Sequence, residues 1–307
     1  MPRPQNILIT GATSGIGRAA ALDLAAAGHR VFAAGRNQRA LDELSATANV
    51  SAHRLDVTDE SSISALRDEV FEQTDGYGVD VLVNNAGYGL AAPMTEVDQD
   101  DLRHQFETNV FGLVAVTRAF VPAMQARRTG TVINVSSTGG RISFPFFGPY
   151  TGTKFAVEAM SDALRVELRG FGVRVSVIEP GPIHTGFADT TMAGVNRYRD
   201  PSSPYASAYA NADAARARAD RMAGSVDDVT RVIARIIRSK RPAPRYVVPF
   251  SSRLMLLASR FVPTRLLDAL LARFLGLTPK QLPSASPSAS GSAEPSPSSS
   301  YGEAQAS

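Results

Sequence analysis

The sequence predicts an α/β fold: a single Rossmann-type domain in which a doubly wound, seven-stranded parallel sheet carries helices on both faces. Short β-type runs alternate along the chain with longer helical patterns, which is typical of such a sheet. The first strand runs directly into a glycine-rich turn that opens a helix. With 307 residues and 44% hydrophobic content, the chain can bury one full core without dividing into two domains.

Seven short apolar runs predict the strands, at 6–10, 30–34, 51–55, 81–84, 131–135, 173–178 and 246–248. Six longer segments predict the helices, at 16–27, 39–46, 60–73, 99–127, 150–170 and 226–239. Right-handed crossovers make the strands parallel, and such folds bind ligands beyond the carboxyl ends of their strands. We therefore expect the chemistry to lie in the segments that follow strands.

Three segments stand outside this alternation. Residues 185–224 mix Gly, Pro, Asn and Tyr with alternating Ala and Arg, and they predict a mobile lid over a site. The dinucleotide-binding and catalytic domain is expected to span 1–250, including this lid, and a helical extension follows at 251–280. The tail at 281–307 is mostly Ser, Pro and Ala and is predicted to be disordered.

The extension carries an apolar stripe at helical spacing, which predicts an amphipathic helix. The stripe comprises Leu266, Leu267, Leu270, Leu271, Phe274 and Leu275, and charged residues lie opposite it at Arg265, Asp268 and Arg273. We expect this helix to close the fold. The alternatives are a cover over the substrate entrance, contact with a second subunit, and peripheral contact of 252–277 with a membrane surface.

Composition excludes several classes of function. The formal charge of +3 comes from scattered arginines rather than basic blocks, so we expect no nucleic-acid partner. The absence of cysteine excludes disulfides, thiolate catalysis and cysteine-based zinc sites, and no metal site is expected. No apolar run reaches membrane-spanning length, and only six residues precede the first apolar run, Ile7-Leu8-Ile9. A cytoplasmic location is the expectation.

The turn after the first strand has the composition of a dinucleotide-binding loop. Its glycines let the backbone approach a pyrophosphate, and the helix that follows offers free N–H groups and the positive end of its dipole. The expected contacts in this turn are Gly11, Thr13, Ser14, Gly15, Ile16 and Gly17.

The end of the second strand predicts NADP(H) rather than NAD(H) as the cofactor. An acidic residue there would bind the ribose hydroxyl of NAD(H), but the sequence reads Ala34-Gly35-Arg36. Arg36 is available to pair with the additional phosphate of NADP(H), unless it is only a solvated charge at a helix start. After the third strand, Asp56 and Val57 are expected beside the adenine, with a helix cap as the alternative role of Asp56.

Tyr150 and Lys154 are four residues apart and share one face of a predicted helix. Tyrosine ordinarily titrates near ~10, and a neighbouring ammonium favours its phenolate form. The pair has the groups needed for acid and base chemistry, although this spacing alone also arises by chance.

With four further motifs, the chain resembles the short-chain dehydrogenase/reductase family over roughly 6–250. The motifs are Asn84-Asn85-Ala86-Gly87 after the fourth strand, a helical Asn109, Ser137 thirteen residues before Tyr150, and Pro180-Gly181 after the sixth strand. The resemblance implies that Tyr150 is the acid and base, and that Ser137 orients the substrate oxygen. It also implies that Lys154 holds the nicotinamide ribose and lowers the tyrosine pKa, and that Asn109 positions a water. Because asparagine is a poor helix former, we expect a kink at Asn109 that frees a carbonyl.

The same resemblance implies further contacts. The cofactor is expected to meet Asn84, Ala86, Gly87, Tyr150, Lys154, Pro180, Gly181, Ile183 and Thr185. The substrate is expected to meet Ser137, Phe144, Phe147, Tyr150 and Phe187. The phenylalanines of the loop at 138–149 predict an apolar pocket wall, unless they pack beneath the loop as core.

The segments around this loop and at 177–187 look most like the 17β-hydroxysteroid and retinol dehydrogenase branch of the family. That likeness implies a hydrophobic alcohol or carbonyl substrate that is steroid-, retinoid- or lipid-like. Family members commonly pair through the helices that carry Asn109 and Tyr150, so a homodimer or homotetramer is expected. The alternative to an enzyme is a protein that binds NADP(H) as a redox sensor or scaffold without turnover.

Overall fold

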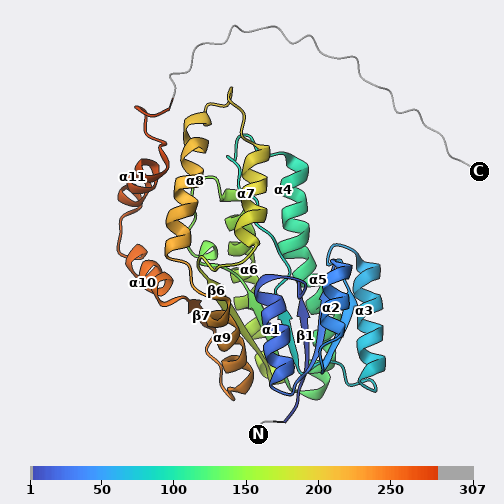
Figure 1. The fold of residues 1–307 in the computed structure, drawn as a ribbon. Helices are drawn as coiled ribbons and strands as arrows, with labels where there is room; N and C mark the ends of the chain where they lie inside the picture. Colours follow the sequence, from blue (N-terminus) through green and yellow to red (C-terminus); the bar gives the residue numbers. More distant parts are fainter. Residues whose placement is uncertain (1–2, 283–307) are drawn as a thin grey trace, which may run out of the picture.

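Seven parallel strands form one sheet in the computed structural model, which describes residues 3–282 (Figure 1). The strands are β1 (Asn6–Thr10), β2 (Arg30–Gly35), β3 (Val50–Arg54), β4 (Val81–Asn84), β5 (Gly130–Val135), β6 (Val173–Pro180) and β7 (Arg245–Val248). Their order across the sheet is β3-β2-β1-β4-β5-β6-β7. The predicted fold class is thereby confirmed, with strand ends displaced by at most two residues.

The central strands are buried on both faces, which is why they read as continuous apolar runs. In β1, Ile7, Leu8 and Ile9 are all fully buried, and they pair in register with β2 on one side and β4 on the other. The chain moves outward from β1 to β3 and then starts again at β4. Open α/β sheets form their ligand crevice at such a switch point, beyond the carboxyl ends of the two strands.

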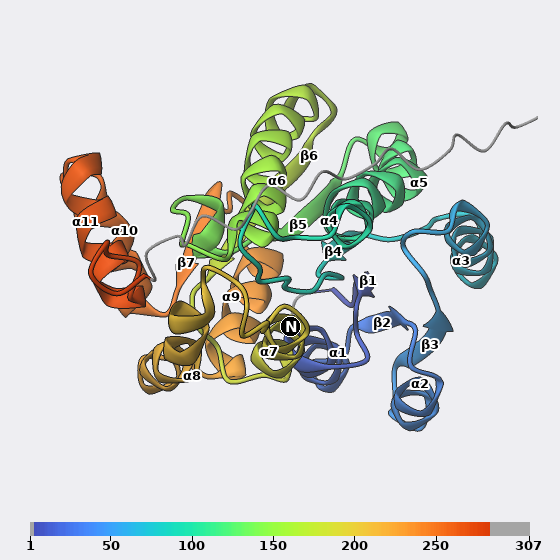
Figure 2. The same ribbon diagram turned by 90° about the horizontal axis from the view of Figure 1, so that it is seen from above.

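Helices cover both faces of the sheet (Figure 2). One layer contains α1 (Gly15–Ala26), α2 (Gln38–Ser45) and α9 (Val226–Arg238), and the other contains α3 (Glu60–Gln73), α5 (Gly112–Arg127) and α6 (Gly148–Glu167). Each layer has its own core. Leu24 and Ile233 belong to the first core, whereas Leu66 and Phe120 belong to the second. Short 3₁₀ turns follow β5 and α6, at Thr138–Gly140 and Arg169–Phe171.

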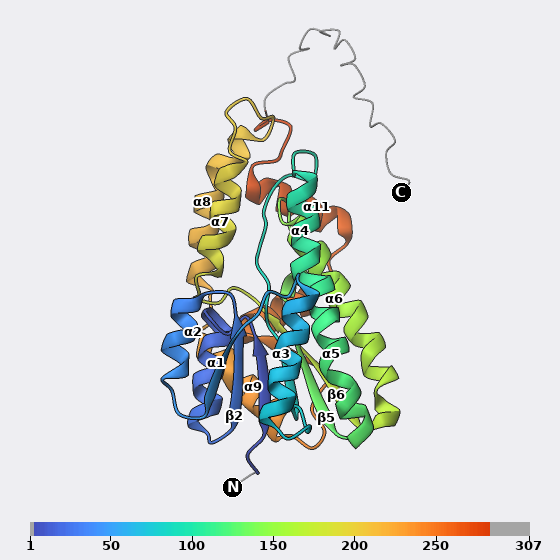
Figure 3. The ribbon, with the colours of Figure 1, turned by 90° about the vertical axis from the view of Figure 1, so that its right-hand side faces the viewer.

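Three helices rise beyond the carboxyl ends of the strands, namely α4 (Gln99–Phe106), α7 (Phe187–Arg197) and α8 (Ala206–Arg221) (Figure 3). The segment predicted as a lid is therefore mostly helical. Alanine and arginine favour helix, but here they lack the apolar period that would have predicted one. The two ends of the segment meet where Ile183 pairs with Gly224. The segment is thus a helical hairpin whose ends meet at this bridge. Hydrogen bonds from Tyr198 to Asp101 and from Ser203 to Glu96 also tie it to the body.

Two predicted helices are divided in the structure. The segment at 99–127 is interrupted by a π-helical turn, Glu107–Phe111, which contains Asn109, so the helix departs from regular α-helical geometry at the residue where the kink is expected. The C-terminal extension consists of α10 (Phe250–Ser259) and α11 (Thr264–Leu275), separated near Pro263. Apart from its first two residues, the predicted tail lies outside the described residues. Among the helices of 3–282, none combines the length and apolar character needed to cross a membrane.

Candidate active site

The glycine-rich turn after β1 is packed so closely that only glycine fits at its ends. A Cβ atom on Gly11 would lie 2.8 Å from Cα of Ala86, and one on Gly17 would overlap the carbonyl oxygen of Gly11. Gly11 and Gly15 adopt φ angles of 65° and 50°, which residues with side chains rarely do. The side chain of Ser14 makes no capping hydrogen bond to α1, which leaves the first N–H groups of that helix for a ligand. This cradle fits the pyrophosphate of a dinucleotide.

Asn85 and Thr10 hold the cradle in place. Asn85 Nδ2 donates to the carbonyl oxygens of Thr10 at 3.0 Å and Gly11 at 3.2 Å. Thr10 Oγ1 in turn accepts from the N–H group of Ala86 at 3.0 Å. The cradle and the end of β4 therefore form one rigid unit at the switch point of the sheet.

Asn84, which the sequence places among the cofactor contacts, has its side chain inside the sheet layer. Its Nδ2 donates to Thr117 Oγ1 at 3.0 Å and to Asn134 Oδ1 at 2.9 Å. Successive strand residues point to opposite faces, so Asn85 turns toward the glycines and Asn84 away from them. The side chain of Asn84 braces the central strands.

The end of β2 presents Arg36 beside Asp56. The Arg36 side chain is 64% exposed, and its Nη1 lies 4.0 Å from Asp56 Oδ2. Burial opposes ionisation of Asp56, but hydrogen bonds from Thr58 and the charge of Arg36 outweigh it and hold the pKa of Asp56 below its ordinary value. A Cβ on Gly35 would lie 2.6 Å from Thr13 Cγ2, so no side chain fits at position 35 unless Thr13 moves.

The loop after β3 shows which of two expected roles Asp56 can have, a place beside the adenine or a helix cap. Asp59 caps α3, because its Oδ1 accepts from the N–H group of Ser61 at 2.9 Å. Asp56 is therefore not the helix cap. The side chain of Val57 belongs to the core beneath Gly112, so Val57 offers a ligand only its backbone.

Ser137 and Tyr150 lie side by side beyond β5. A Cβ on Gly139 would be 3.3 Å from Ser137 Oγ and 3.5 Å from Tyr150 Cε1, and the two side chains share a hydrogen bond. Ser137 Oγ accepts from the N–H group of Gly139 at 3.0 Å and lies 3.3 Å from the carbonyl oxygen of Pro180. The predicted pair of hydroxyls is thus assembled by the loop that joins β5 to α6.

Burial controls the protonation of the catalytic candidates. It raises the pKa of Tyr150 to about 12, against the opposing effect of the hydrogen bond with Ser137. The sequence predicts a lowered pKa instead, since it shows the neighbouring charge but not the burial. Burial also lowers the pKa of Lys154 to about 8, opposed by the carboxylate of Glu158. Lys154 Nζ donates to the Val135 carbonyl at 2.9 Å and lies 5.8 Å from the centre of the Tyr150 ring.

Asn109 lies next to this group and is almost completely buried. Its Oδ1 accepts from the N–H group of Tyr88 at 3.1 Å, and its Nδ2 donates to the carbonyl oxygen of Tyr88 and to Thr153 Oγ1. A Cβ on Gly87 would lie 3.0 Å from Asn109 Oδ1 and 3.8 Å from Lys154 Nζ. The structure therefore brings together Asn109, Gly87 and Lys154, three of the predicted site residues.

Thr153 and Tyr88 are two parts of the site that sequence reasoning missed. Thr153 Oγ1 accepts from Asn109 and donates to the carbonyl oxygen of Tyr150 at 2.7 Å, which joins the π turn to α6. The only signal for Thr153 was a hydroxyl next to Lys154. Tyr88 contributes through its backbone, which no residue pattern reveals.

The segment after β6 lies against the glycine cradle. The Cβ and Cγ2 atoms of Thr185 are 3.5 Å from the position that a Cβ would take on Gly15. Gly181 packs so closely on Ser252 that a Cβ there would overlap the serine hydroxyl. Since the Pro180 carbonyl contacts Ser137, the predicted strip at 180–185 connects the cradle with the catalytic hydroxyls.

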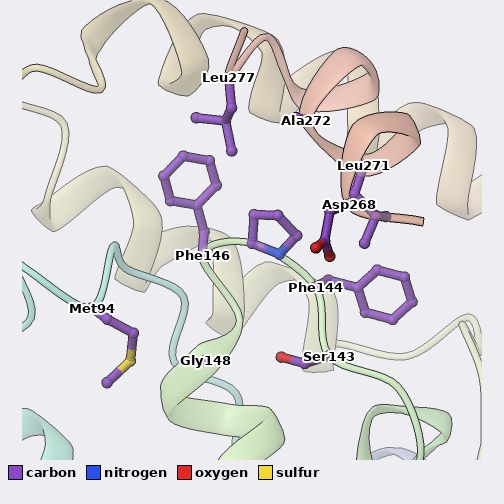
Figure 4. A pocket seen from close by; sticks show the side chains of 10 residues that line it. Met94, Ser143, Phe144, Phe146, Gly148, Asp268, Leu271, Ala272 and Leu277 are labelled. Atoms are coloured by element: carbon purple, nitrogen blue, oxygen red, sulfur yellow. The ribbon is translucent and has the colours of Figure 1, made fainter. Parts of the chain in front are cut away.

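The predicted substrate phenylalanines take three different positions. The ring of Phe187 lies over Tyr150, with the ring centres 5.4 Å apart. Phe147 packs into the lid with Val195 and Tyr209 and is part of a small core. Phe144 lines a cavity of about 370 Å³ between the loop at 143–148 and α11 (Figure 4). The other apolar side chains of this cavity are Met94, Pro145, Phe146, Leu271, Ala272 and Leu277.

A buried ion-pair network behind the site was also not predicted from the sequence. Glu179 is fully buried, and its Oε1 lies 3.1 Å from Arg141 Nη1 and 3.2 Å from Arg245 Nε. Arg245 pairs as well with Glu158, which is one helical turn from Lys154. Burial raises the pKa of Glu179 despite its two arginines. These residues come from four distant segments, so no local spacing predicted the network.

A dinucleotide cradle at the switch point of a parallel sheet, facing a buried phenol, a buried ammonium and a half-buried serine, defines a nicotinamide-dependent oxidoreductase. Within residues 3–282, no group of His, Asp or Glu side chains is arranged to hold a metal ion.

The chain belongs to the short-chain dehydrogenase family, since the family model for short chain dehydrogenases matches residues 5–195. An NADPH-dependent 3-dehydrocapnine reductase from Ornithobacterium rhinotracheale is 34% identical over 85% of this chain and 94% of its own. A 3-ketodihydrosphingosine reductase from Bacteroides thetaiotaomicron is 37% identical over 61% of this chain and 67% of its own.

Solved structures show the same fold. A short-chain dehydrogenase/reductase from Burkholderia phymatum in complex with NAD is 28% identical, with a TM-score of 0.72 over 87% of this chain and 95% of its own. The names of these relatives include both NADPH and NAD. They agree on a nicotinamide dinucleotide and leave the choice between the two forms open.

Proposed function

We propose that this protein is an NADP(H)-dependent oxidoreductase that interconverts a carbonyl and an alcohol on a hydrophobic substrate. The observation that carries the proposal is the position of Ser137, Tyr150 and Lys154 next to the dinucleotide cradle, with the ring of Phe187 over the phenol. Each of these groups has a separate task in carbonyl reduction.

Reduction places negative charge on the carbonyl oxygen, so the site must supply hydrogen-bond donors and a proton at that atom. Bound NADP(H) would supply the hydride. Ser137 and Tyr150 are the two donors. Because burial raises the pKa of Tyr150 to about 12, the phenol stays protonated until charge develops on the substrate oxygen. The ammonium of Lys154 then stabilises the phenolate that is left behind.

The choice of NADP(H) rests on the end of β2. Arg36 is exposed at the rim of the cradle, where its guanidinium can pair with a phosphate. No carboxylate occupies position 35 to repel that phosphate, and Thr13 blocks any side chain there. The residues that would hold the cofactor are Gly11, Thr13, Ser14, Gly15, Ile16, Gly17, Arg36, Asp56, Val57, Ala86, Gly87, Lys154, Ile183 and Thr185.

An apolar ketone is the substrate class that the side chains near Tyr150 support. The Phe187 ring lies tilted against the phenol, with the ring centres 5.4 Å apart. The cavity at the loop before Tyr150 is lined mainly by apolar side chains, and none of Ser137, Tyr150 and Lys154 lines it. Two relatives are named as reductases of 3-dehydrocapnine and 3-ketodihydrosphingosine. Neither name contains a steroid or a retinoid. A steroid- or retinoid-like substrate is therefore supported only by the likeness of the segments at 138–149 and 177–187 to the 17β-hydroxysteroid and retinol dehydrogenase branch.

A redox sensor or scaffold is the competing function. Such a protein needs the cradle but has no use for a buried proton donor with a serine partner. The complete set of Ser137, Tyr150, Lys154 and Asn109 therefore favours an enzyme.

The proposal is tested by incubating the protein and NADPH with a panel of ketones and aldehydes and following the loss of NADPH absorbance. The panel contains 3-ketodihydrosphingosine, a steroid ketone and retinal, with dihydroxyacetone as a small polar control. We expect turnover of at least one apolar compound and little with the control. Tight NADPH binding without turnover of any compound would favour the sensor.

A further inference from the structure

The outer surface of α10 and α11 carries a row of exposed apolar side chains. Phe250, Leu254, Leu257 and Phe261 are 77%, 59%, 55% and 81% exposed, and they follow one another at spacings of four, three and four residues. That spacing places all four on one face of α10 and its end. Leu266 and Leu270 continue the row on α11, where they are 52% and 54% exposed.

The same two helices are attached to the body by their opposite faces. In α10, the buried Ser252 lies under Gly181. In α11, Leu271 and Ala272 line the cavity beside the loop that precedes Tyr150 (Figure 4). The outward row therefore belongs to neither the core nor the cavity.

Basic residues border this row. The segment at 250–282 contains five basic residues, Arg253, Arg260, Arg265, Arg273 and Lys280, and one acidic residue, Asp268. At 100° per residue, Arg253 and Arg260 lie on one flank of the apolar face of α10. None of the five makes an ion pair with a residue in 3–282. Asp268 is directed toward the cavity (Figure 4).

We propose that α10 and α11 dock this protein on the surface of an anionic lipid bilayer. The row of apolar side chains would enter the boundary between headgroups and acyl chains, while the arginines pair with anionic headgroups. An apolar face bordered by arginine is the pattern of helices that lie in a membrane interface rather than cross it.

Charge decides between a bilayer and a second copy of the chain. In a twofold dimer the same patch meets itself, so the arginines of one copy can pair only with charges of the same patch on the other copy. With one acid for five basic residues, that contact lacks the opposite charges that a stable polar rim needs. An anionic bilayer supplies these charges at every arginine.

The test uses the full chain and sedimentation with vesicles. One set of vesicles is phosphatidylcholine alone, and the other contains about one third phosphatidylglycerol, which makes the surface anionic. We expect the protein to sediment with the anionic vesicles and to be released as salt is raised, because salt screens the headgroup charge. Equal sedimentation with both sets, or none with either, would overturn the proposal.

Variants locate the surface. Leu254→Ser combined with Leu257→Ser should lower binding to anionic vesicles about tenfold or more, since two exposed leucines no longer enter the bilayer. Phe171→Ser, at a residue 42% exposed in the 3₁₀ turn after α6, is the control and should bind as the unmodified protein does. Retained NADPH binding shows that each variant is folded. If the double variant instead turns a dimer into a monomer without changing sedimentation, the surface is an interface between copies and the proposal is wrong.

Discussion

Tyr150 is surrounded by protein so completely that burial decides its chemistry. The spacing from Lys154 predicts a phenol pushed toward its ionised form, whereas the structure raises the pKa of Tyr150 to about 12. A protonated donor suits reduction, in which the proton is needed only once charge appears on the substrate. Spacing along the sequence reports which charges are near, but burial depends on segments from the whole chain.

The pH dependence of reduction should follow Lys154. Burial lowers the pKa of its ammonium to about 8, so the positive charge is present below that pH and lost above it. We expect the kcat/KM for reduction to be level at neutral pH and to fall as the pH rises through about 8. The measurement is kcat/KM across this pH range with a ketone that does not titrate.

Glu158 provides the control for this assignment. Its carboxylate raises the pKa of Lys154 against the effect of burial, so Glu158→Gln should move the falling limb to lower pH. The amide oxygen that this variant introduces would still be able to accept a hydrogen bond from Arg245. If kcat/KM falls at the same pH in the variant and the unmodified protein, another group controls the rate.

Arg36 should determine the cofactor preference. Arg36→Ala removes a guanidinium that pairs with a phosphate, and because the site is exposed the expected loss is roughly tenfold in the KM for NADPH. The KM for NADH should hardly change. Arg39→Ala, which removes an almost fully exposed arginine of α2, is the matched control. Equal effects on both cofactors would contradict the assignment.

Replacing Gly35 by Asp is a poor test of the cofactor preference, since any side chain there meets Thr13.

The π turn is the element that joins the catalytic helix to the end of β4. Asn109 binds both backbone groups of Tyr88 and also Thr153, and all of these bonds are buried or partly buried. Asn109→Ala should lower the free energy of unfolding by about 1–3 kcal/mol, because buried polar groups lose their partner. Urea unfolding measures this loss. An unchanged midpoint would mean that the turn forms without its asparagine.

Elements with a strong local pattern were predicted well. The β-branched runs located every strand, and the poor helix propensity of Asn109 indicated the break in the segment at 99–127. Contacts between distant elements were not predictable in this way. Nothing local distinguishes Phe147, which packs in the lid, from Phe144 at the cavity, or shows that Arg141 and Arg245 meet at Glu179.

The whole molecule presents a second apolar face, on α6, which differs from that of α10 and α11. Phe155 and Val166 are exposed on one side of α6, and Phe111 is exposed at the π turn. We propose that two copies pair through this face, which is the expected family arrangement. Light scattering should then give twice the chain mass of 32.6 kDa, and Val166→Glu should give the monomer. The double variant of Leu254 and Leu257 should stay dimeric. A monomeric unmodified protein would contradict the pairing.

The most direct test of the proposed chemistry is Tyr150→Phe, which removes one hydroxyl and keeps the ring. With a substrate found in the panel, kcat/KM should fall by about 10²–10⁴-fold, the usual contribution of a general acid, while the dissociation constant of NADPH stays the same. Tyr77→Phe removes a hydroxyl that bonds Asp80 and should keep full activity. If Tyr150→Phe reduces the ketone as fast as the unmodified protein does, Tyr150 is not the proton donor.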